Sequence, residues 1–434
     1  MTKRHFLLCM WEGGGTVPPE IGLARKLIAR GHLVDVLGDP TIEAEARRAG
    51  CGFQPWQEAP SVKERKPEAA LVRDWEHKSV SQTLHEYVTT FLCDPAARHG
   101  RDTLRALEAT KADVVLTDMA LFGPSMAAEA LGIPRIGLMP NIYILPVRGI
   151  PPMGPGLMPA RGPLGELRDW LLRTIMTRLF NGGTRTLNAC RAELKLAPIA
   201  GVIHQFLNVD RMLVLTSPSF DFPTDHLPKH VQYVGPVLDD PTWASGHWEM
   251  PWPHDYSDPI VLVGFSSTFQ NQGAIVRRCI EALSSLPVRG IVTLGEQLNL
   301  SEFASTRNVV VTKSAPHQII LENASAIITH CGHGTAMKAM YAGVPAVCIP
   351  MGRDQNDTAA RIVARGAGIR LKTKDSAERI AEAVRSVLNN PSYRDRARAL
   401  SSRIRAELAA KDPSDALLDS LDRARNAAAA IAAE

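Results

Sequence analysis

The sequence lacks long apolar runs, paired cysteines and a strong excess of either charge. No apolar stretch approaches the length of a membrane span, and the early apolar run at 5–11 is too short for a signal peptide. The seven cysteines are odd in number and have no metal-ligand spacing, which is typical of reduced thiols. A net charge of +4 gives no case for a nucleic-acid partner. We therefore expect a cytoplasmic protein without a membrane span.

The composition provides enough apolar material for two cores. A chain of 434 residues that is 45% apolar predicts two domains of about 200 residues each. Alternating strand and helix patterns indicate an α/β fold. We expect a first domain at 1–238, a linker rich in Pro, Gly and Trp at 239–258, a second domain at 259–410, and a final helix within 411–434.

The most informative stretch is 314–371, which contains two strand-loop-helix units. In the first, the strand Ala324–Ile328 is followed by the loop HCGHGT and a helix from about Ala336. Glycines after a strand let backbone N–H groups approach a ligand, and the helix N-terminus favours an anion such as a diphosphate. In the second unit, Asp354 and Gln355 follow a strand and supply acceptors and donors for sugar hydroxyls.

The beginning of the chain has another glycine-rich loop between a strand and a helix. Gly13 and Gly15 satisfy half of the dinucleotide-binding fingerprint. The third glycine position is Pro18, which would prevent the close helix–strand packing that the fingerprint requires. The sequence therefore disfavours a nicotinamide cofactor.

Taken together, the ordered motifs of 314–371 resemble the nucleotide-sugar signature of the family-one, UDP-glycosyltransferase-like enzymes, in particular the bacterial natural-product and macrolide type. The motifs are the Pro-His loop at 316–317, H-x-G-x-G-T, A-G-V-P and D-Q. The resemblance implies a GT-B fold, in which two Rossmann-like domains face each other across a cleft. It also implies an inverting, nucleotide-sugar-dependent hexosyltransferase whose first domain binds the acceptor and whose last helix crosses back onto that domain.

The resemblance places the sugar-nucleotide donor in the second domain. His330 would contact the diphosphate, a hydroxyl-bearing loop would meet the phosphates, and Asp354 and Gln355 would hold the sugar. Two positions depart from the plant UDP-sugar enzymes, with Ser314 in place of a tryptophan and Lys338 in place of a glutamate, which leaves UDP versus dTDP open. The predicted donor residues are Ser266, Ser267, Thr268, Ser314, His317, Gln318, His330, Gly332, His333, Gly334, Thr335, Lys338, Asp354 and Gln355.

The catalytic base is uncertain because the family's first loop usually carries a histidine where this chain has Thr16. In the family that histidine removes the acceptor's proton and an aspartate orients it. Asp118, at the end of a buried strand, takes the aspartate's position and is our first candidate base. Glu12 and Thr16 are the other candidates, and Thr16 would alternatively only cap the first helix.

Residues 56–110 and 139–163 are the least regular parts of the pattern. The predicted acceptor-binding residues are Trp11, Gly15, His77 and Met139, with His85 a weaker candidate. The segment 139–163, rich in Pro, Gly and Met, would form either a flexible lip over an apolar acceptor or a packed crossover. A single amphipathic helix is predicted over 164–194, and core packing is favoured over contact with a membrane surface.

We expect a sugar to be moved from a UDP- or dTDP-sugar to a small apolar acceptor such as a polyketide, flavonoid or other phenol. No metal site is visible, and the nucleotide sugar would be a substrate, so no cofactor is expected. The protein would be a monomer or homodimer. A non-catalytic donor-binding or activating partner that kept this fold is the main alternative, and a sugar-nucleotide epimerase is a weaker one.

Overall fold

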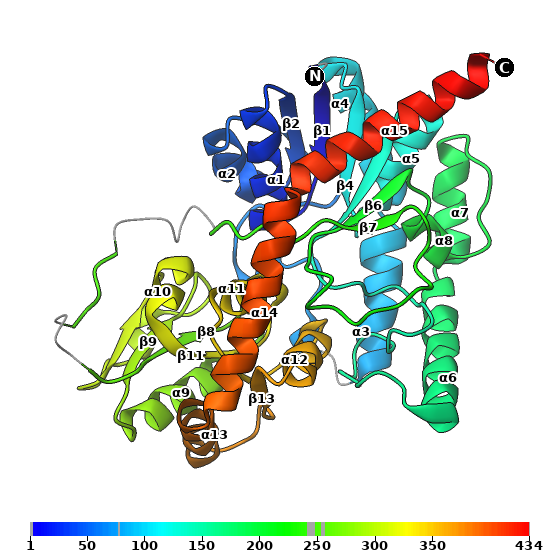
Figure 1. The fold of residues 1–434 in the computed structure, drawn as a ribbon. Helices are drawn as coiled ribbons and strands as arrows, with labels where there is room; N and C mark the ends of the chain where they lie inside the picture. The colour runs from blue at the N-terminus through cyan, green and yellow to red at the C-terminus, as the bar shows by residue number, and fades with distance from the viewer. Residues whose placement is uncertain (1–2, 77–78, 241–247, 253–256, 434) are drawn as a thin grey trace.

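Two entirely parallel β-sheets form the framework of the chain (Figure 1). The computed structural model describes residues 3–76, 79–240, 248–252 and 257–433. The first sheet has the strand order β3-β2-β1-β4-β5-β6-β7, and the second has the order β10-β9-β8-β11-β12-β13. The predicted α/β class with two parallel-sheet domains is confirmed.

The elements of the first sheet and its helices span residues 5–233. The strands are β1 (His5–Cys9), β2 (Leu33–Gly38), β3 (Gly52–Pro55), β4 (Val114–Asp118), β5 (Arg135–Met139), β6 (Arg211–Val214) and β7 (Val231–Tyr233). The helices are α1 (Val17–Ala29), α2 (Glu43–Arg48), α3 (Val80–Glu86), α4 (Ala96–Thr110), α5 (Phe122–Leu131), α6 (Gly162–Asn181), α7 (Thr184–Glu193) and α8 (Val202–Phe206). The short turns η1 (Pro40–Ile42), η2 (Pro67–Ala69) and η3 (Asp74–Glu76) are 3₁₀, and η4 (Tyr87–Cys93) is a π-helix.

The second sheet and its helices follow. The strands are β8 (Ile260–Gly264), β9 (Arg289–Thr293), β10 (Val309–Thr312), β11 (Ala324–Thr329), β12 (Ala346–Cys348) and β13 (Gly368–Arg370). The helices are α9 (Gly273–Ser284), α10 (His317–Asn323), α11 (His333–Ala342), α12 (Gln355–Ala364), α13 (Ala377–Asn389), α14 (Pro391–Ala410) and α15 (Pro413–Ala433), with a 3₁₀ turn η5 (Leu300–Glu302).

Both faces of each sheet are buried, which explains the continuous apolar strands. Successive side chains of a strand point to opposite faces. In β8, Val261 and Val263 belong to one apolar cluster and Leu262 belongs to another. In β1, Leu8 and Leu7 are divided between two clusters in the same way. Such strands read as unbroken apolar runs in the sequence.

The strand order of each sheet reverses at one place. In the first sheet β1 lies between β2 and β4, and in the second sheet β8 lies between β9 and β11. Helices leave the sheet in opposite directions at such a point, so the loops after the two strands leave a crevice in which α/β proteins bind ligands. The predicted loops at 12–16, 266–268 and 330–335, together with Asp118, all follow these strands.

The last two helices run across both domains (Figure 1). The helix α14 packs on α11, and α15 buries Leu417, Leu418 and Leu421 in the apolar cluster of the first sheet. Lys26 on α1 forms an ion pair with Asp412 at 2.7 Å. The domain boundaries at 238, 258 and 410 stay predictions.

Some local expectations were wrong. The helix predicted over 164–194 is two helices, α6 and α7, which meet at Gly182 and Gly183. Most of the large apolar side chains of α6 are exposed, whereas Phe180, Leu187 and Leu194 are buried, so the predicted core packing holds only for the second part of this segment. His77 and Trp243 lie outside the described residues. No helix in the described part of the chain is long and apolar enough to cross a membrane.

Candidate active site

The first turn of α11 has the geometry of an anion site. Gly332 precedes the helix, no side chain caps it, and its first turn contains no acidic residue. The N–H of Ala336 bonds the carbonyl oxygen of Gly332 at 3.0 Å, so the N–H groups of the three preceding residues have no helical acceptor. The positive end of the helix and these N–H groups favour a diphosphate. The helix begins at His333, three residues before the predicted start.

His330 is a neutral imidazole at the base of this turn. Burial lowers the pKa of His330 to about 4, and the ring stacks on Phe265 with centroids 6.1 Å apart. Its Nδ1 atom is buried and has no partner among the described residues. The neighbouring Cys331 is fully buried and has a φ of 68°, which turns the chain sharply into the helix. His330 therefore has a nitrogen available to a bound ligand.

The loop after β8 leaves one hydroxyl group open. The hydroxyls of Ser266 and Thr268 lie 3.0 Å apart, and Arg353 donates to the Thr268 hydroxyl at 2.8 Å. The Ser267 hydroxyl has no partner among the described residues. A Cβ atom at Gly14 would lie 2.8 Å from the Ser267 oxygen, so this hydroxyl faces the first loop.

Asp354 and Gln355 differ in how far their side chains are engaged. Gln355 accepts from the Met351 N–H at 2.8 Å and donates to Gln270 at 2.7 Å, so its amide holds the loop together. The Asp354 carboxylate is bonded only to its own backbone N–H, and burial raises its pKa. The loop before it is strained, because Arg353 has a φ of 55°. Asp354 is therefore the open carboxylate of the pair.

The residues predicted to meet the nucleoside are joined by a residue from the expected linker. Lys338 donates to Asp240 at 2.5 Å, and the Gln318 N–H donates to the same carboxylate at 3.3 Å. His317 pairs with Thr293 at 2.8 Å, and burial lowers its pKa to about 4.

Ser314 and His333 make contacts that differ from the predicted ones. The Ser314 carbonyl accepts from the Thr312 hydroxyl at 3.3 Å. His333 is buried and pairs with Thr216 of the first domain at 2.9 Å. The His333 ring therefore joins the two domains.

Across the cleft, two buried carboxyl groups face each other. Asp118, at the end of β4, accepts from the Ala120 N–H at 2.7 Å, and Glu20 lies on α1 with 0% exposure. No hydroxyl or N–H group of the described residues bonds either oxygen of Glu20 or the second oxygen of Asp118, so the two carboxyl groups are each other's partners there. Burial raises the pKa of Asp118 to about 6, and burial together with the adjacent Asp118 raises the pKa of Glu20 well above its usual range. Glu20 is thus the protonated partner, and its hydrogen bond lowers the pKa of Asp118.

The two other candidate bases are in different states. Glu12 is bonded to Arg65 at 2.8 Å and accepts from the Gly14 N–H at 3.1 Å, so both of its oxygens are engaged. Thr16 precedes α1, but its hydroxyl makes no capping bond and is buried without a partner among the described residues. The capping hypothesis for Thr16 was therefore wrong, and its hydroxyl is open.

An aromatic cluster borders Asp118. The rings of Trp11 and Phe91 lie 4.5 Å apart, and those of Tyr87 and Phe91 lie 5.2 Å apart. Tyr87 and Phe91 belong to the π-helix η4, a rare geometry that is frequent at functional sites. Met139 is fully buried in the same apolar cluster.

Gly15 and His85, two further residues predicted on this side, are both exposed. Gly15 lies on the first loop. A Cβ atom at Gly334 would lie 3.8 Å from the carbonyl oxygen of Gly15, so this loop is close to the first turn of α11. His85 is exposed on α3.

Known proteins share this architecture. The family described as "Erythromycin biosynthesis protein CIII-like, C-terminal domain" matches residues 277–418. The 4'-demethylrebeccamycin synthase of Lentzea aerocolonigenes is 29% identical over 96% of this chain and 97% of its own length. The oleandomycin glycosyltransferase of Streptomyces antibioticus is 25% identical over 94% of this chain and 88% of its own.

Solved structures share the fold over the whole chain. The glycotransferase of kitacinnamycin covers 97% of this chain and 98% of its own with a TM-score of 0.75 at 22% identity. The spinosyn rhamnosyltransferase SpnG, solved with thymidine diphosphate, covers 96% of this chain and 100% of its own with a TM-score of 0.66 at 19% identity. The chain therefore has the GT-B fold and is similar over its whole length to glycosyltransferases of natural-product type. The alternative of a non-catalytic partner is disfavoured, because the relatives are named as enzymes.

Polar and aromatic contacts join the two domains of this glycosyltransferase beside Asp354. Arg353 of the second domain forms a bidentate ion pair with Asp74 of the first, at 2.6 and 3.0 Å. Beside it, Trp75 packs edge-on against Phe269 with centroids 5.2 Å apart. The segment at 74–76 therefore bridges the domains beside Asp354.

The segment 139–163 is a packed crossover of the glycosyltransferase, and the alternative of a free lip is not supported. The N–H groups of Gly154 and Gly156 donate to Asp357 on α12 at 2.6 and 2.9 Å. Arg370 donates to the carbonyl oxygen of Gly156 at 3.1 Å. These bonds tie the segment to the second domain.

Three residues of interest were missed in the sequence. Glu20 and Asp240 have no motif of their own, and each gains its meaning from a partner far along the chain. Burial is the largest cause of the raised pKa of Tyr87. The negative charges of Asp118 and Asp354, which both lie near Tyr87, raise its pKa further. The helical spacing at 80–92 indicated a helix but gave no sign of its π geometry. The described residues contain no group of three or more His, Cys, Asp or Glu that could hold a metal ion.

Proposed function

We propose that this glycosyltransferase moves a sugar from a UDP- or dTDP-sugar to a hydroxyl group of a small apolar acceptor, with inversion at the anomeric carbon. The observation that carries the proposal is the pairing of two sites across one cleft. The uncapped turn of α11 suits a diphosphate, and the Asp118–Glu20 pair opposite suits the removal of a proton. A structural neighbour, SpnG, was solved with thymidine diphosphate and also with the spinosyn aglycone.

The donor diphosphate would bind between the loops after β8 and β11. Backbone N–H groups of Gly334 and Thr335 and the free hydroxyl of Ser267 would donate hydrogen bonds to it, and the neutral ring of His330 would lie against it. Such preorganised donors stabilise the charge that develops on a departing diphosphate. The open carboxylate of Asp354 would hold hydroxyl groups of the sugar.

The base would be Asp118. The acceptor oxygen attacks the anomeric carbon as the bond from that carbon to the diphosphate oxygen breaks, and the acceptor's proton passes to the Asp118 carboxylate. A pKa of about 6 leaves Asp118 ionised at neutral pH and gives it useful basicity. Glu20 stays protonated and positions Asp118, while the free Thr16 hydroxyl would contact the acceptor oxygen.

The nucleoside would lie over His317, Gln318 and the Lys338–Asp240 pair. Asp240 brings a carboxylate to the region in which the plant enzymes use a glutamate for the ribose, although Lys338 stands at the glutamate's own position. The nucleotide sugar is a substrate, and the proposal includes no cofactor. We do not assign Glu12, Gln355 or His333 to substrate, because their polar groups are engaged within the protein.

The acceptor would lie against the aromatic cluster of Trp11, Tyr87 and Phe91. This placement favours an aromatic or polyketide-like molecule, because ring faces bury large apolar areas at low entropic cost. The 4'-demethylrebeccamycin synthase and the oleandomycin glycosyltransferase are named after natural products, which supports an acceptor of this class.

A thermal-shift screen against UDP, dTDP and their sugar conjugates tests the donor half of the proposal. A ligand at about a hundred times its Kd stabilises the folded state by roughly 2.7 kcal/mol, which is readily measured. We expect a clear preference for one of the two nucleotides. No shift with either nucleotide would contradict the proposed donor site. Release of the nucleotide diphosphate only in the presence of an apolar acceptor would support transfer, and equal release without an acceptor would contradict it.

A further inference from the structure

The helix α6 presents a row of apolar side chains to the outside of the molecule. Leu167, Leu171, Ile175 and Leu179 follow one another at four-residue spacing and are 51%, 47%, 50% and 40% exposed. Leu164, at the start of the helix, is 83% exposed. Residues at this spacing lie on one face of a helix, so the five side chains form a continuous stripe. Only Asp169 and Phe180 of this helix are buried.

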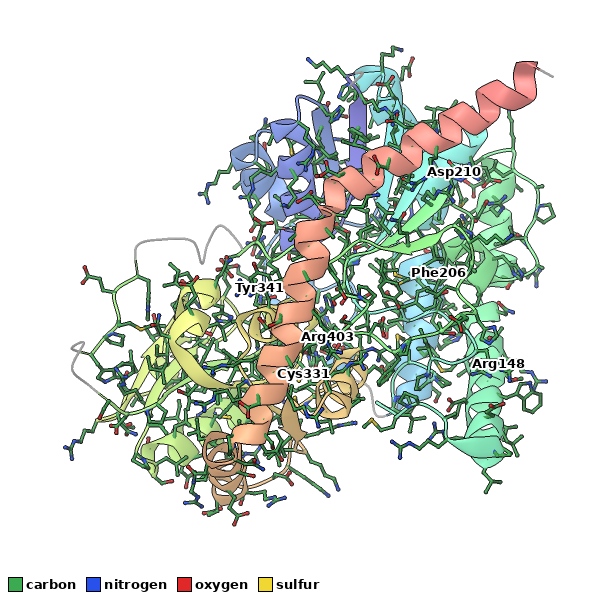
Figure 2. All side chains as sticks on the ribbon, in the orientation of Figure 1. Arg148, Phe206, Asp210, Cys331, Tyr341 and Arg403 are labelled. Atoms are coloured by element: carbon green, nitrogen blue, oxygen red, sulfur yellow. The ribbon has the colours of Figure 1, made fainter. Side chains whose placement is uncertain are left out.

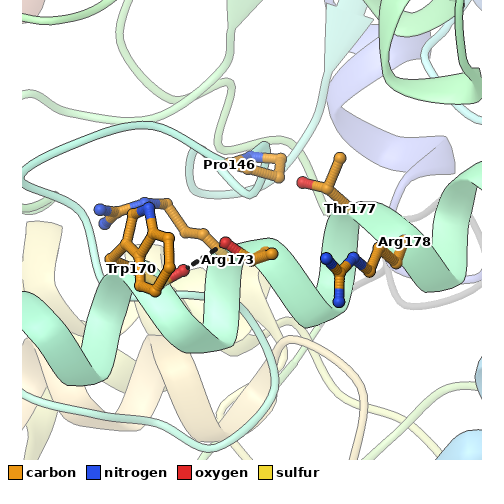
Figure 3. Close-up of a pocket in the computed structure, with 6 residues that line it drawn as sticks. Pro146, Trp170, Arg173, Thr177 and Arg178 are labelled. Carbon is orange, nitrogen blue, oxygen red and sulfur yellow. Dashed lines mark hydrogen bonds between the residues drawn. The ribbon is translucent and has the colours of Figure 1, made fainter.

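A shallow hollow of about 450 Å³ lies beside this stripe (Figure 3). Its lining combines one large ring, Trp170, with two guanidinium groups, those of Arg173 and Arg178. Pro146 closes it from the segment before the helix. Trp170 is 55% exposed, and Arg178 borders both the hollow and the apolar stripe.

The charges around the stripe are positive and mostly unpaired. Glu166 forms an ion pair with Arg148 at 3.3 Å, and the Arg148 side chain lies beside α6 (Figure 2). The buried Asp169 is bonded to Arg168 at 2.8 Å. Among the described residues, none is an acidic partner for Arg161, Arg173, Arg178 or Arg185 on or beside this helix. The surface therefore combines an apolar stripe, a tryptophan and four free guanidinium groups.

We propose that α6 binds an anionic phospholipid surface and lies in the plane of the bilayer interface. A helix that exposes a row of leucine and isoleucine side chains, with a tryptophan and arginines on the adjoining faces, has chemistry that suits the interface of a bilayer. The apolar stripe would enter the boundary between headgroups and acyl chains, and Trp170 would lie at headgroup level. Phosphate groups would bind in the hollow that Arg173 and Arg178 both line.

Other occupants of this face fit the charges less well. A second copy of this chain would bring another set of unpaired arginines to the same stripe if it bound symmetrically, which is unfavourable. A membrane surface that carries negative charge matches both the apolar row and the arginines. The proposal does not depend on the proposed reaction, because it concerns a face of the molecule that carries none of the proposed substrate-binding residues.

Vesicle flotation of the full chain, without any substrate, tests the proposal. The probes are vesicles of phosphatidylcholine alone and of phosphatidylcholine with phosphatidylglycerol, each at low and high salt. We expect the protein to float with the anionic vesicles at least about tenfold more tightly than with the neutral ones, and high salt to reduce this preference. Equal recovery with both kinds of vesicle, or recovery with neither, would overturn the proposal.

Matched variants separate this surface from general stickiness. Replacing Arg173 and Arg178 by glutamine should remove most of the preference for anionic vesicles, a loss of about tenfold or more. A control with Arg385 and Arg394 replaced by glutamine, two exposed arginines on α13 and α14 without described partners, should float like the parent protein. Equal effects of the two pairs would overturn the proposal.

The apolar stripe has its own pair of variants. Leu167, Leu171 and Ile175 replaced by glutamine should weaken flotation with every vesicle, whereas Leu131 and Leu300 replaced by glutamine should not. Unchanged thermal unfolding and unchanged nucleotide binding would show that the variants are folded. Size-exclusion chromatography with light scattering tests the competing hypothesis, in which this face binds a second copy of the chain. A dimer that the α6 substitutions dissociate, with no vesicle binding by the parent, would assign the face to a second copy instead.

Discussion

At the crossover between β8 and β11 the open polar groups are hydrogen-bond donors or neutral side chains, whereas at the crossover between β1 and β4 they include two acids. The first place has the uncapped turn of α11, the Ser267 hydroxyl and the neutral His330. The second has Asp118 and Glu20. The two sheets have the same strand pattern around these points, so the chemistry depends on a few side chains and not on the fold.

Burial acts on both places in the same direction, which is toward the neutral form, and yet its consequences differ. It lowers the pKa of His330 to about 4 and raises the pKa of Asp118 to about 6. A neutral imidazole adds no positive charge, so the helix end and the hydroxyls would supply the hydrogen bonds to the phosphates while the His330 ring lies against them. A carboxylate with a raised pKa becomes a better base. The same physical cause therefore prepares one side to bind an anion and the other to accept a proton.

The substitution Asp118→Asn should produce the largest effect. We expect kcat to fall about 10²–10⁴-fold, because a positioned general base typically contributes that much. The Kd for the bare nucleotide diphosphate should not change, because Asp118 is in the first domain and the proposed diphosphate site is formed by the loops after β8 and β11. Turnover is measured by nucleotide release and binding by calorimetry. Glu12→Gln is the control, and it should reduce kcat less because that carboxylate is held by Arg65.

An equal fall in kcat and in nucleotide affinity for Asp118→Asn would contradict this division of labour between the two sides. A larger loss of kcat for Glu12→Gln than for Asp118→Asn would transfer the role of the base to Glu12.

The substitution Asp354→Ala should have the next largest effect and sharpen the same division. Loss of a carboxylate that bonds sugar hydroxyls is worth about 10–100-fold in kcat/KM for the sugar nucleotide. Affinity for the bare nucleotide diphosphate should stay nearly constant. Equal loss of both would show that Asp354 does not act on the sugar. Gln355→Ala instead should lower the Tm, because Gln355 bonds the backbone of Met351 and the side chain of Gln270.

The substitution Glu20→Ala should move the pH dependence of the reaction. The rate should fall as pH decreases through about 6, where Asp118 becomes protonated. Glu20 stays protonated and donates a hydrogen bond that lowers the pKa of Asp118, so its removal should move this acidic limb upward by about one pH unit. Glu20→Gln keeps a donor and should leave the limb in place.

The measurement for Glu20 is the pH profile of kcat/KM for the two variants and the parent. Movement of the limb to lower pH in Glu20→Ala would show that Glu20 is ionised and repels Asp118, which would contradict the assignment of the proton.

Much of this architecture could be predicted from local pattern. Buried parallel strands read as apolar runs, so β4 with Asp118 at its end and β11 with the glycine loop after it were both placed within a residue or so. The loop residues that matter for an anion are glycines and hydroxyls next to a strand, and their physical reason is local. The predicted start of α11 was late because Gly332 and His333 do not look like helix-forming residues, whereas the helix begins at His333.

The parts that could not be predicted depend on contacts between distant residues. Lys338 and Asp240 are 98 positions apart, and the linker composition gave no reason to place an aspartate beside the nucleoside site. Glu20 looks like an ordinary acidic residue in the first turn of a helix, and only the packing of α1 on β4 makes it a buried partner of Asp118. Periodicity detected the apolar side of α6 but could not tell whether that side faces the core or the outside.

Ser267→Ala should give the smallest effect. It tests the contribution of a single hydroxyl group to phosphate binding. The Ser267 hydroxyl is the open one of its loop, and a hydrogen bond to a phosphate of this kind is worth about 3–10-fold in affinity for the nucleotide diphosphate. Affinity for the nucleoside without phosphates should not change, which calorimetry with both ligands can show. Ser266→Ala would break the contact with Thr268 and should affect both ligands through the shape of the loop. A loss of nucleoside affinity in Ser267→Ala would mean that this hydroxyl also shapes the loop, and that the α11 turn and His330 hold the phosphates without it.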